Sequence, residues 1–215
     1  MTSTPCHHNE HTVLVVYASA SGSTAEIAEF LAEQLRARGL HVRTAMAADA
    51  PDAALFEVAV LGSAVHNGEL LPELNTYIER NREALRHRPV WLFSVGMGPA
   101  MRGPIGRRLK RMVPPQIARV RDDVAALEYR PLAGVYHAPT SLRMRLLLRL
   151  IGTPYGDLRE WDAVSAWAET IAAGVDIALE PAHLPARTTN SDLGTRLDIE
   201  TYRRFADLFG KPSRT

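Results

Sequence analysis

TVLVVYASASGST, residues 12–24, joins a short apolar run to a loop of small hydroxyl residues. The run Thr12–Tyr17 is rich in β-branched residues and shows no polar alternation, which predicts a strand buried on both faces. Thr24–Arg38 follows the loop, and its apolar residues at four-residue spacing predict a helix that ends near Gly39 (Ile27, Leu31 and Leu35). A strand, a small-residue loop and a helix in this order form the first part of a βαβ unit.

The same alternation continues along the chain. Further strands are expected at Leu40–Ala45, Glu57–Gly62, Pro89–Val95 and Pro131–His137. Helices are expected at Leu71–Leu85 and Trp161–Leu179, with shorter helices or turns at Asp49–Leu55, Ile105–Met112, Pro115–Val120, Leu142–Ile151 and Asp198–Phe209. Strands that alternate with helices at this spacing predict an α/β fold with a doubly wound, five-stranded parallel sheet.

The length of 215 residues fits one domain with tails. Residues 1–11 are polar and predict a flexible N-terminal tail, residues 12–180 form the predicted domain, and residues 181–215 predict a linker and a short helix. The tail gathers Cys6, His7, His8 and His11, which resembles a metal cluster. Zinc ligands need a turn or helix to hold them, and none is predicted here, so no metal site is expected.

Composition excludes several classes of protein. Hydrophobic residues make up 46% of the chain and charged residues 23%, which excludes global disorder and a coiled coil. A single cysteine, Cys6, excludes an intrachain disulfide. The sequence shows no signal peptide and no apolar run of the ~18 residues that a membrane span needs. These features predict a soluble cytoplasmic protein.

The charge of the chain is uneven although its net charge is only +1. Between Ala84 and Arg121 there are nine Lys or Arg residues and no acidic residue. This segment is a solvated basic surface, a site for an anionic substrate, or a contact with an anionic membrane that gives access to a quinone. From Arg102 to Arg121 no aromatic residues are interleaved with these charges and no base-reading module is present, so nucleic acid is not an expected partner. The helix at 142–151, with its arginines, is expected either at a membrane interface or against the core with its arginines reaching solvent.

The loop after the first strand has the composition of a phosphate site. Hydroxyls and backbone N–H groups of Ser19–Thr24 meet at the positive end of a helix dipole, and Gly22 permits a tight turn. An ordinary helix-capping turn would have a similar composition. The loop is not a P-loop, because no G-x-x-x-x-G-K-[ST] occurs. A dinucleotide fingerprint after the fourth strand fails because Met101 stands where the third glycine is required.

VVYASASGST, residues 15–24, resembles the phosphate loop of flavodoxins. Two later loops, 62–69 and 94–99, fall where flavodoxins contact the flavin ring. This resemblance implies a flavodoxin-like sheet of strand order 2-1-3-4-5 with a basic insertion before the last strand, and non-covalent FMN as cofactor. It implies phosphate contacts from Ser19, Ala20, Ser21, Gly22, Ser23 and Thr24, and ring contacts from Ser63, Ala64, Val65, His66, Asn67, Gly68, Ser94, Val95, Gly96, Met97 and Gly98.

The chain differs from electron-carrier flavodoxins in two ways. Its two ring loops contain no Trp, Tyr or Phe, and His66 and Met97 are the nearest substitutes. The sequence pI of about 8.0 also contrasts with the acidic character of such carriers. Both differences disfavour a general electron shuttle.

The core also resembles the flavodoxin-type protoporphyrinogen oxidase family. That family has a basic insertion before the last strand, a basic helix after it, and a D/E-W motif at the start of the last helix, here Glu160-Trp161. The resemblance implies a flavin oxidoreductase that passes electrons from a reduced anionic substrate to a quinone, with peripheral membrane contact through 102–121 and 142–151. His66 and His137 are candidates for proton transfer. An electron-transfer module without a substrate and a flavin-free interaction protein remain alternatives.

Overall fold

The computed structural model describes residues 11–97, 99, 113–136 and 156–179. Parallel strands form its centre in the order β2-β1-β3-β5-β6, and β4 pairs antiparallel with β3 beside this path. Their bounds are β1 Thr12–Ala18, β2 His41–Met46, β3 Val58–His66, β4 Glu69–Leu70, β5 Val90–Val95 and β6 Glu128–Leu132. Counted among the parallel strands alone, this order is the predicted 2-1-3-4-5. The α/β flavodoxin-like fold is therefore confirmed.

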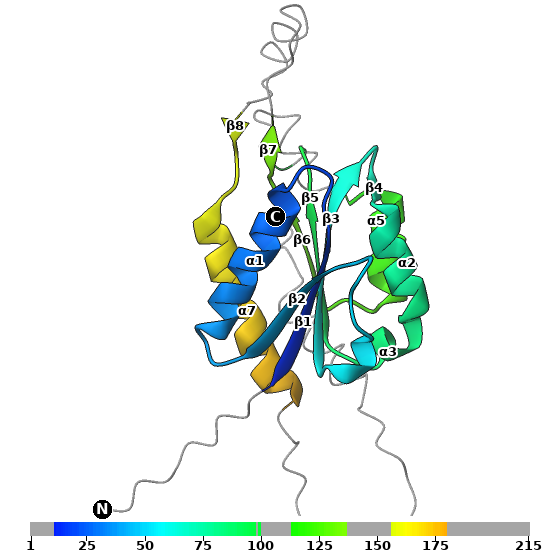
Figure 1. Cartoon of the computed structure of the whole chain (residues 1–215), viewed down its shortest axis with the longest axis vertical. Helices are drawn as coiled ribbons and strands as arrows, with labels where there is room; N and C mark the ends of the chain where they lie inside the picture. Colours follow the sequence, from blue (N-terminus) through cyan, green and yellow to red (C-terminus); the bar gives the residue numbers. More distant parts are fainter. Residues whose placement is uncertain (1–10, 98, 100–112, 137–155, 180–215) are drawn as a thin grey trace, which may run out of the picture.

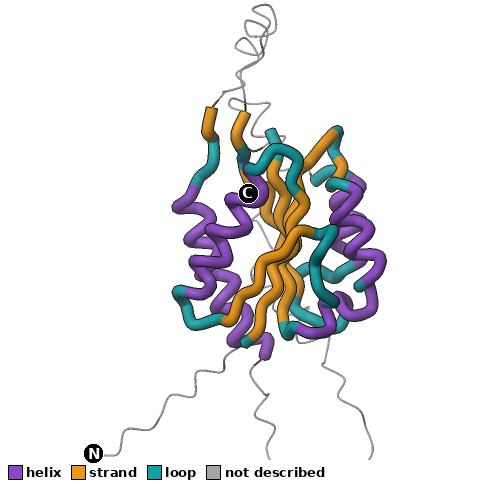
Figure 2. Tube along the Cα trace, in the orientation of Figure 1, coloured by secondary structure: helices purple, strands orange, loops and turns teal. Residues whose placement is uncertain are grey.

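Helices cover both faces of the sheet (Figures 1 and 2). One face carries α1 (Ser23–Arg36) and α7 (Trp161–Leu179), and the other carries α2 (Pro72–Arg80), α3 (Arg82–Arg86) and α5 (Pro115–Asp123). A short 3-10 helix, η1, spans Ala53–Leu55, and the two-residue strands β7 (Val135–Tyr136) and β8 (Gly156–Asp157) pair with each other. None of the helices in the described ranges is long and apolar enough to cross a membrane.

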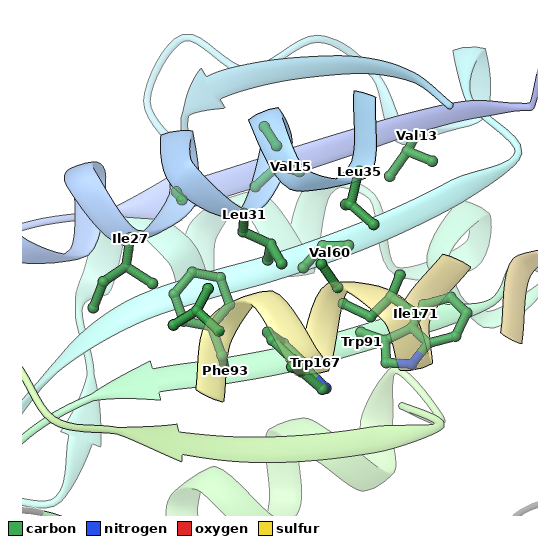
Figure 3. Packing of buried hydrophobic residues seen from close by; sticks show 14 of the residues in the cluster. Val13, Val15, Ile27, Leu31, Leu35, Val60, Trp91, Phe93, Trp167 and Ile171 are labelled. Atoms are coloured by element: carbon green, nitrogen blue, oxygen red, sulfur yellow. The ribbon is translucent and has the colours of Figure 1, made fainter. Parts of the chain in front are cut away.

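The core on the α1 and α7 face shows why the sequence folds this way (Figure 3). Ile27, Leu31 and Leu35 are fully buried or nearly so, since their four-residue spacing places them on one side of α1. Phe93 of β5 and Trp167 of α7 pack edge to face, with ring centroids 5.8 Å apart. Such an aromatic pair stabilises the contact beyond the area it buries. This packing fixes α1 against the sheet and so fixes where its first turn lies.

The structure corrects three of the predicted elements. The strand predicted at 57–62 continues to His66 as β3, because β4 turns back and pairs with its end. The helix predicted at 71–85 is interrupted at Asn81, whose side chain accepts a hydrogen bond from the Ala53 N–H and donates one to the Tyr77 carbonyl. These bonds to backbone groups stabilise a break in the helix.

The last predicted strand is also shifted. It was expected at Pro131–His137, but β6 covers Glu128–Leu132 and ends before Ala133. Val135 and Tyr136 leave the sheet and form β7, so Tyr136 does not end a strand of the main sheet. The predicted short helix at 115–120 is confirmed as α5. The tail up to Glu10, the helices expected at 105–112, 142–151 and 198–209, and the linker at 181–197 lie outside the described residues.

Candidate functional site

The loop between β1 and α1 lies at the carboxyl end of β1, which pairs with β2 on one side and β3 on the other. Gly22 has φ +93°, a left-handed conformation that favours glycine, and the side-chain oxygen of Ser19 accepts the Gly22 N–H at 3.0 Å. Ala20 and Ser21 are exposed at the tip of the loop. No side chain caps the start of α1, so the first N–H groups of this helix remain free to bind an anion.

Thr24 provides the most informative atom of this loop. Its side chain is 0% exposed, and its hydroxyl oxygen has no hydrogen-bond partner. A buried hydroxyl without a partner costs about 1–3 kcal/mol, so native proteins avoid it unless the group has another use. An anion bound at the start of α1 would accept this hydrogen bond. The loop therefore fits the phosphate of FMN by the chemistry of its donors.

The loop expected at 62–69 is a β-hairpin formed by β3 and β4. Its turn residues Asn67 and Gly68 have φ of 53° and 84°, which suits a tight hairpin turn. His66 and Asn67 are exposed. Behind them, Val65 lies under the next loop, because a Cβ at Gly96 would be 3.4 Å from the Val65 Cβ. The structure thus brings the two predicted ring loops together.

Two of the predicted ring residues have side chains that are used inside the fold. The Ser63 hydroxyl donates to the Ala64 carbonyl and accepts the Leu71 N–H, both at 2.8 Å. The Ser94 hydroxyl lies 2.7 Å from that of Tyr129, and burial raises the pKa of this tyrosine. Both serines are almost fully buried. Their side chains stabilise the ends of β3 and β5, which leaves only their backbone groups for a ligand.

The exposed side of the ring loops lacks aromatic residues. Among the described positions of the two loops, Met97 is 41% exposed and His66 is also exposed. These two side chains are therefore the candidates to take the place of the aromatic residues. Gly98 and His137 lie outside the described residues, so their predicted roles stay predictions. A pocket of about 320 Å³ opens next to the hairpin turn, between Asn67 and Gly68 on one side and Pro115 and Arg119 of α5 on the other. It places one arginine of the basic segment near the candidate ring site.

Sequence reasoning missed two contacts of the predicted phosphate loop. Gly134 passes so close that a Cβ there would be 2.8 Å from Val95 and 3.1 Å from the Ser23 hydroxyl. Arg159 forms an ion pair with Glu26 in the first turn of α1. Glu26 and Arg159 are separated by 133 positions, and no spacing rule connects residues so far apart. Only the D/E-W motif at Glu160-Trp161 marked this part of the chain.

The predicted absence of a metal site concerns a tail that is mostly outside the described residues. His11, its last residue, is buried, and its side-chain nitrogen lies 3.4 Å from a Glu57 carboxylate oxygen. Within the described ranges, no three His, Cys, Asp or Glu residues are grouped so that they could hold a metal ion.

Comparisons with known proteins agree with this geometry. The flavodoxin domain family matches residues 14–123, which include the loop after β1, the hairpin and β5. No sequence among the curated proteins matches the chain. A flavodoxin from the domain Archaea is similar in structure, with 15% identity, a TM-score of 0.51, and coverage of 77% of this chain and 99% of that one.

The rubredoxin oxygen:oxidoreductase of Desulfovibrio gigas is also similar. Its identity is 15% and its TM-score 0.52, and the match covers 79% of this chain but only 37% of that protein. At this level of identity the two structural matches show the shared fold. The match to the family is what connects the loops described above with a cofactor.

Proposed function

Because the chain belongs to the flavodoxin domain family, whose cofactor is FMN, we propose that it is an FMN-dependent oxidoreductase with its phosphate loop at Ser19–Thr24. The observation that carries this proposal is the buried Thr24 hydroxyl without a partner at the start of α1. A phosphate monoester there would accept that hydroxyl and the free N–H groups of the first turn. Ser21 and Ser23 contribute further hydroxyls.

The isoalloxazine ring belongs, in this proposal, between the hairpin at 63–68 and the loop at 94–98. The contact between Val65 and Gly96 places these two segments side by side at the carboxyl ends of β3 and β5. Ligands of open α/β sheets bind at this edge. Because Ser63 and Ser94 are hydrogen-bonded inside the fold, backbone groups and the side chains of Val65, Asn67 and Met97 would form the ring contacts.

Bound FMN would accept an electron pair from a reduced substrate and pass it to a quinone-type acceptor. The chain's own contribution is to bind and orient. The α1 dipole and the hydroxyls of the loop hold the phosphate, and the hairpin fixes the edge of the ring. His66, exposed at the end of β3, is a candidate to move a proton near that edge.

The substrate class in this proposal is an anionic reduced tetrapyrrole, as for the protoporphyrinogen oxidase family. One feature supports it: Arg119 of the basic segment lines the pocket beside the hairpin, together with Glu69. A cytoplasmic location with contact to an anionic membrane is also proposed. It rests on the basic segments 102–121 and 142–151, of which only 113–121 is described.

Absorption spectroscopy of purified protein tests the cofactor, since bound FMN gives flavin bands and FMN without protein is removed by gel filtration. Colourless protein that takes up no FMN would overturn the proposal. The FMN-loaded protein is then mixed anaerobically with protoporphyrinogen, with menadione as acceptor. Formation of the fluorescent porphyrin in proportion to menadione supports the oxidase. Reduction by redox proteins without porphyrin formation would instead identify an electron-transfer module.

A further inference from the structure

An acidic side chain stands next to the proposed phosphate loop. Glu26 lies in the first turn of α1, and its N–H donates to the Gly22 carbonyl at 3.0 Å. One of its carboxylate oxygens is 3.9 Å from the position that a Cβ would take at Gly22. A carboxylate at this place repels a phosphate, and it can also interact with the helix dipole in place of a ligand.

A single arginine pairs with this carboxylate. One terminal nitrogen of Arg159 bonds the second oxygen of Glu26, and the other lies 2.6 Å from Asp157. The guanidinium carbon also lies 4.6 Å from the ring centroid of Trp161, which itself packs against Phe30 of α1 at 4.8 Å. The Arg159 side chain is only 10% exposed. Its position is therefore fixed from several sides.

Glu26 thus shares one positive charge with Asp157, and that charge comes from a distant part of the chain. Arg159 lies two residues before Trp161, the first residue of α7, and α7 packs along α1 (Figure 1). Because the packing of the two helices brings Arg159 to Glu26, the pair forms only in the folded domain. The pairing also holds one Glu26 oxygen on Arg159.

We propose that Arg159 is a positioning residue for the cofactor phosphate: it neutralises and orients Glu26, so that the loop binds a phosphorylated flavin in preference to an unphosphorylated one. The inference rests on the proposed phosphate site at Ser19–Thr24. It goes beyond that site because it assigns a role to two residues outside the loop.

The alternative is that Arg159 only stabilises the packing of α7 against α1. The chain offers a matched control for this, because Arg38 bonds Glu169 of α7 at 2.9 Å and lies just after the other end of α1. Arg38 thus joins the same two helices by the same type of ion pair, far along the helix from the phosphate loop. Replacing Arg38 therefore tests the effect of losing an ion pair between α1 and α7 without changing the charge near the loop.

The experiment measures the dissociation constants of FMN and riboflavin by flavin fluorescence for apo-protein of the wild type and four variants: Arg159→Gln, Glu26→Gln, the double variant and Arg38→Gln. Arg159→Gln removes one positive charge beside the loop, and for a charge about 8 Å from a phosphate dianion in a water-like dielectric this loss should weaken FMN binding about fivefold at low salt. Riboflavin binding should stay unchanged. The double variant should recover FMN affinity to within about twofold of the wild type, and higher salt should reduce the effect.

Different failures have different meanings. If the wild type binds FMN no more tightly than riboflavin, the proposed phosphate site is wrong, and this inference falls with it. If the wild type prefers FMN and Arg159→Gln weakens both flavins equally, or Arg38→Gln has the same effect, Arg159 is only structural. Failure of Glu26→Gln to restore FMN binding in the double variant would also overturn the inference. Circular dichroism of each variant confirms that its fold is retained.

Discussion

Replacing Thr24 with valine should affect the apo-protein and the FMN complex in opposite directions. Valine has nearly the same shape as threonine and a similar helix propensity, so packing in the first turn of α1 is preserved. The change removes one hydroxyl that is 0% exposed and has no hydrogen-bond partner. Because that hydroxyl is desolvated without compensation, Thr24→Val should stabilise the apo-protein by about 1 kcal/mol.

The FMN complex should respond with a loss of affinity. If the Thr24 hydroxyl donates to the phosphate, removing it eliminates a hydrogen bond to a charged group, which contributes about 1.5–3 kcal/mol. The dissociation constant of FMN should then rise about 10- to 100-fold, while riboflavin, which has no phosphate, binds as before. Urea unfolding of the apo-protein measures the first effect, and flavin fluorescence titration measures the second.

A threonine with a satisfied hydroxyl serves as the control. The side-chain oxygen of Thr12 accepts the Glu57 N–H at 3.2 Å, at the start of β1 and away from the phosphate loop. Because the Glu57 N–H also donates to the Thr12 carbonyl at 3.1 Å, Thr12→Val should destabilise the protein by at most about 1 kcal/mol and leave FMN affinity unchanged. The reasoning is refuted if Thr24→Val destabilises the apo-protein as Thr12→Val does, or if it binds FMN as tightly as the wild type.

Three further changes test the fold around the site. Gly62→Ala places a Cβ 2.1 Å from the buried ring of Phe93, so the free energy of unfolding should fall by about 3 kcal/mol in urea titration. Ser63→Ala leaves the Leu71 N–H without its acceptor, and should cost about 1–2 kcal/mol and increase hydrogen exchange at that amide. Burial and, to a smaller extent, the charge of Asp52 raise the pKa of Tyr77 to about 12. As the pH rises, the Tyr77 phenol therefore loses its proton in the unfolded chain before it does so in the folded protein. The free energy of unfolding should fall between pH 10 and 12 for this reason. Tyr77→Phe should weaken that fall by about 3 kcal/mol when unfolding is followed across the same pH range.

Each of these has a clear contrary result. A Gly62→Ala protein as stable as the wild type would show that Phe93 can move aside. Fast exchange at Leu71 in the wild type would mean that its bond to Ser63 does not form. Equal pH dependence of the wild type and Tyr77→Phe would show that the phenol is not desolvated in the folded protein.

Local pattern in the sequence was sufficient for much of the fold. The helix at Trp161–Leu179 has the bounds that its apolar spacing predicts, and β1, β2 and β5 lie within one residue of their expected limits. These elements are set by side-chain periodicity and by glycine and proline at their ends, which act over a few residues. The small-residue loop after β1 was recognisable for the same reason.

The errors occurred where distant residues compete with local preference. Asn81 interrupts a helix whose apolar spacing is continuous, because its side chain bonds Ala53 on η1. The predicted loop at 62–69 is a hairpin since β4 pairs back on β3. In both places, backbone groups find partners that the sequence pattern does not show.

The sequence by itself determined the order of strands and helices along the chain and the position of the small-residue loop at the carboxyl end of β1. Tertiary structure decided which side chains of that edge are available. In the folded protein the hydroxyls of Ser63 and Ser94 form hydrogen bonds with other parts of the fold, and the Thr24 hydroxyl has no partner. Folding also brings Arg159 to Glu26. The physical reason is range: periodicity and turn chemistry act between near neighbours, whereas the charge beside a loop depends on how α1 and α7 pack across the sheet.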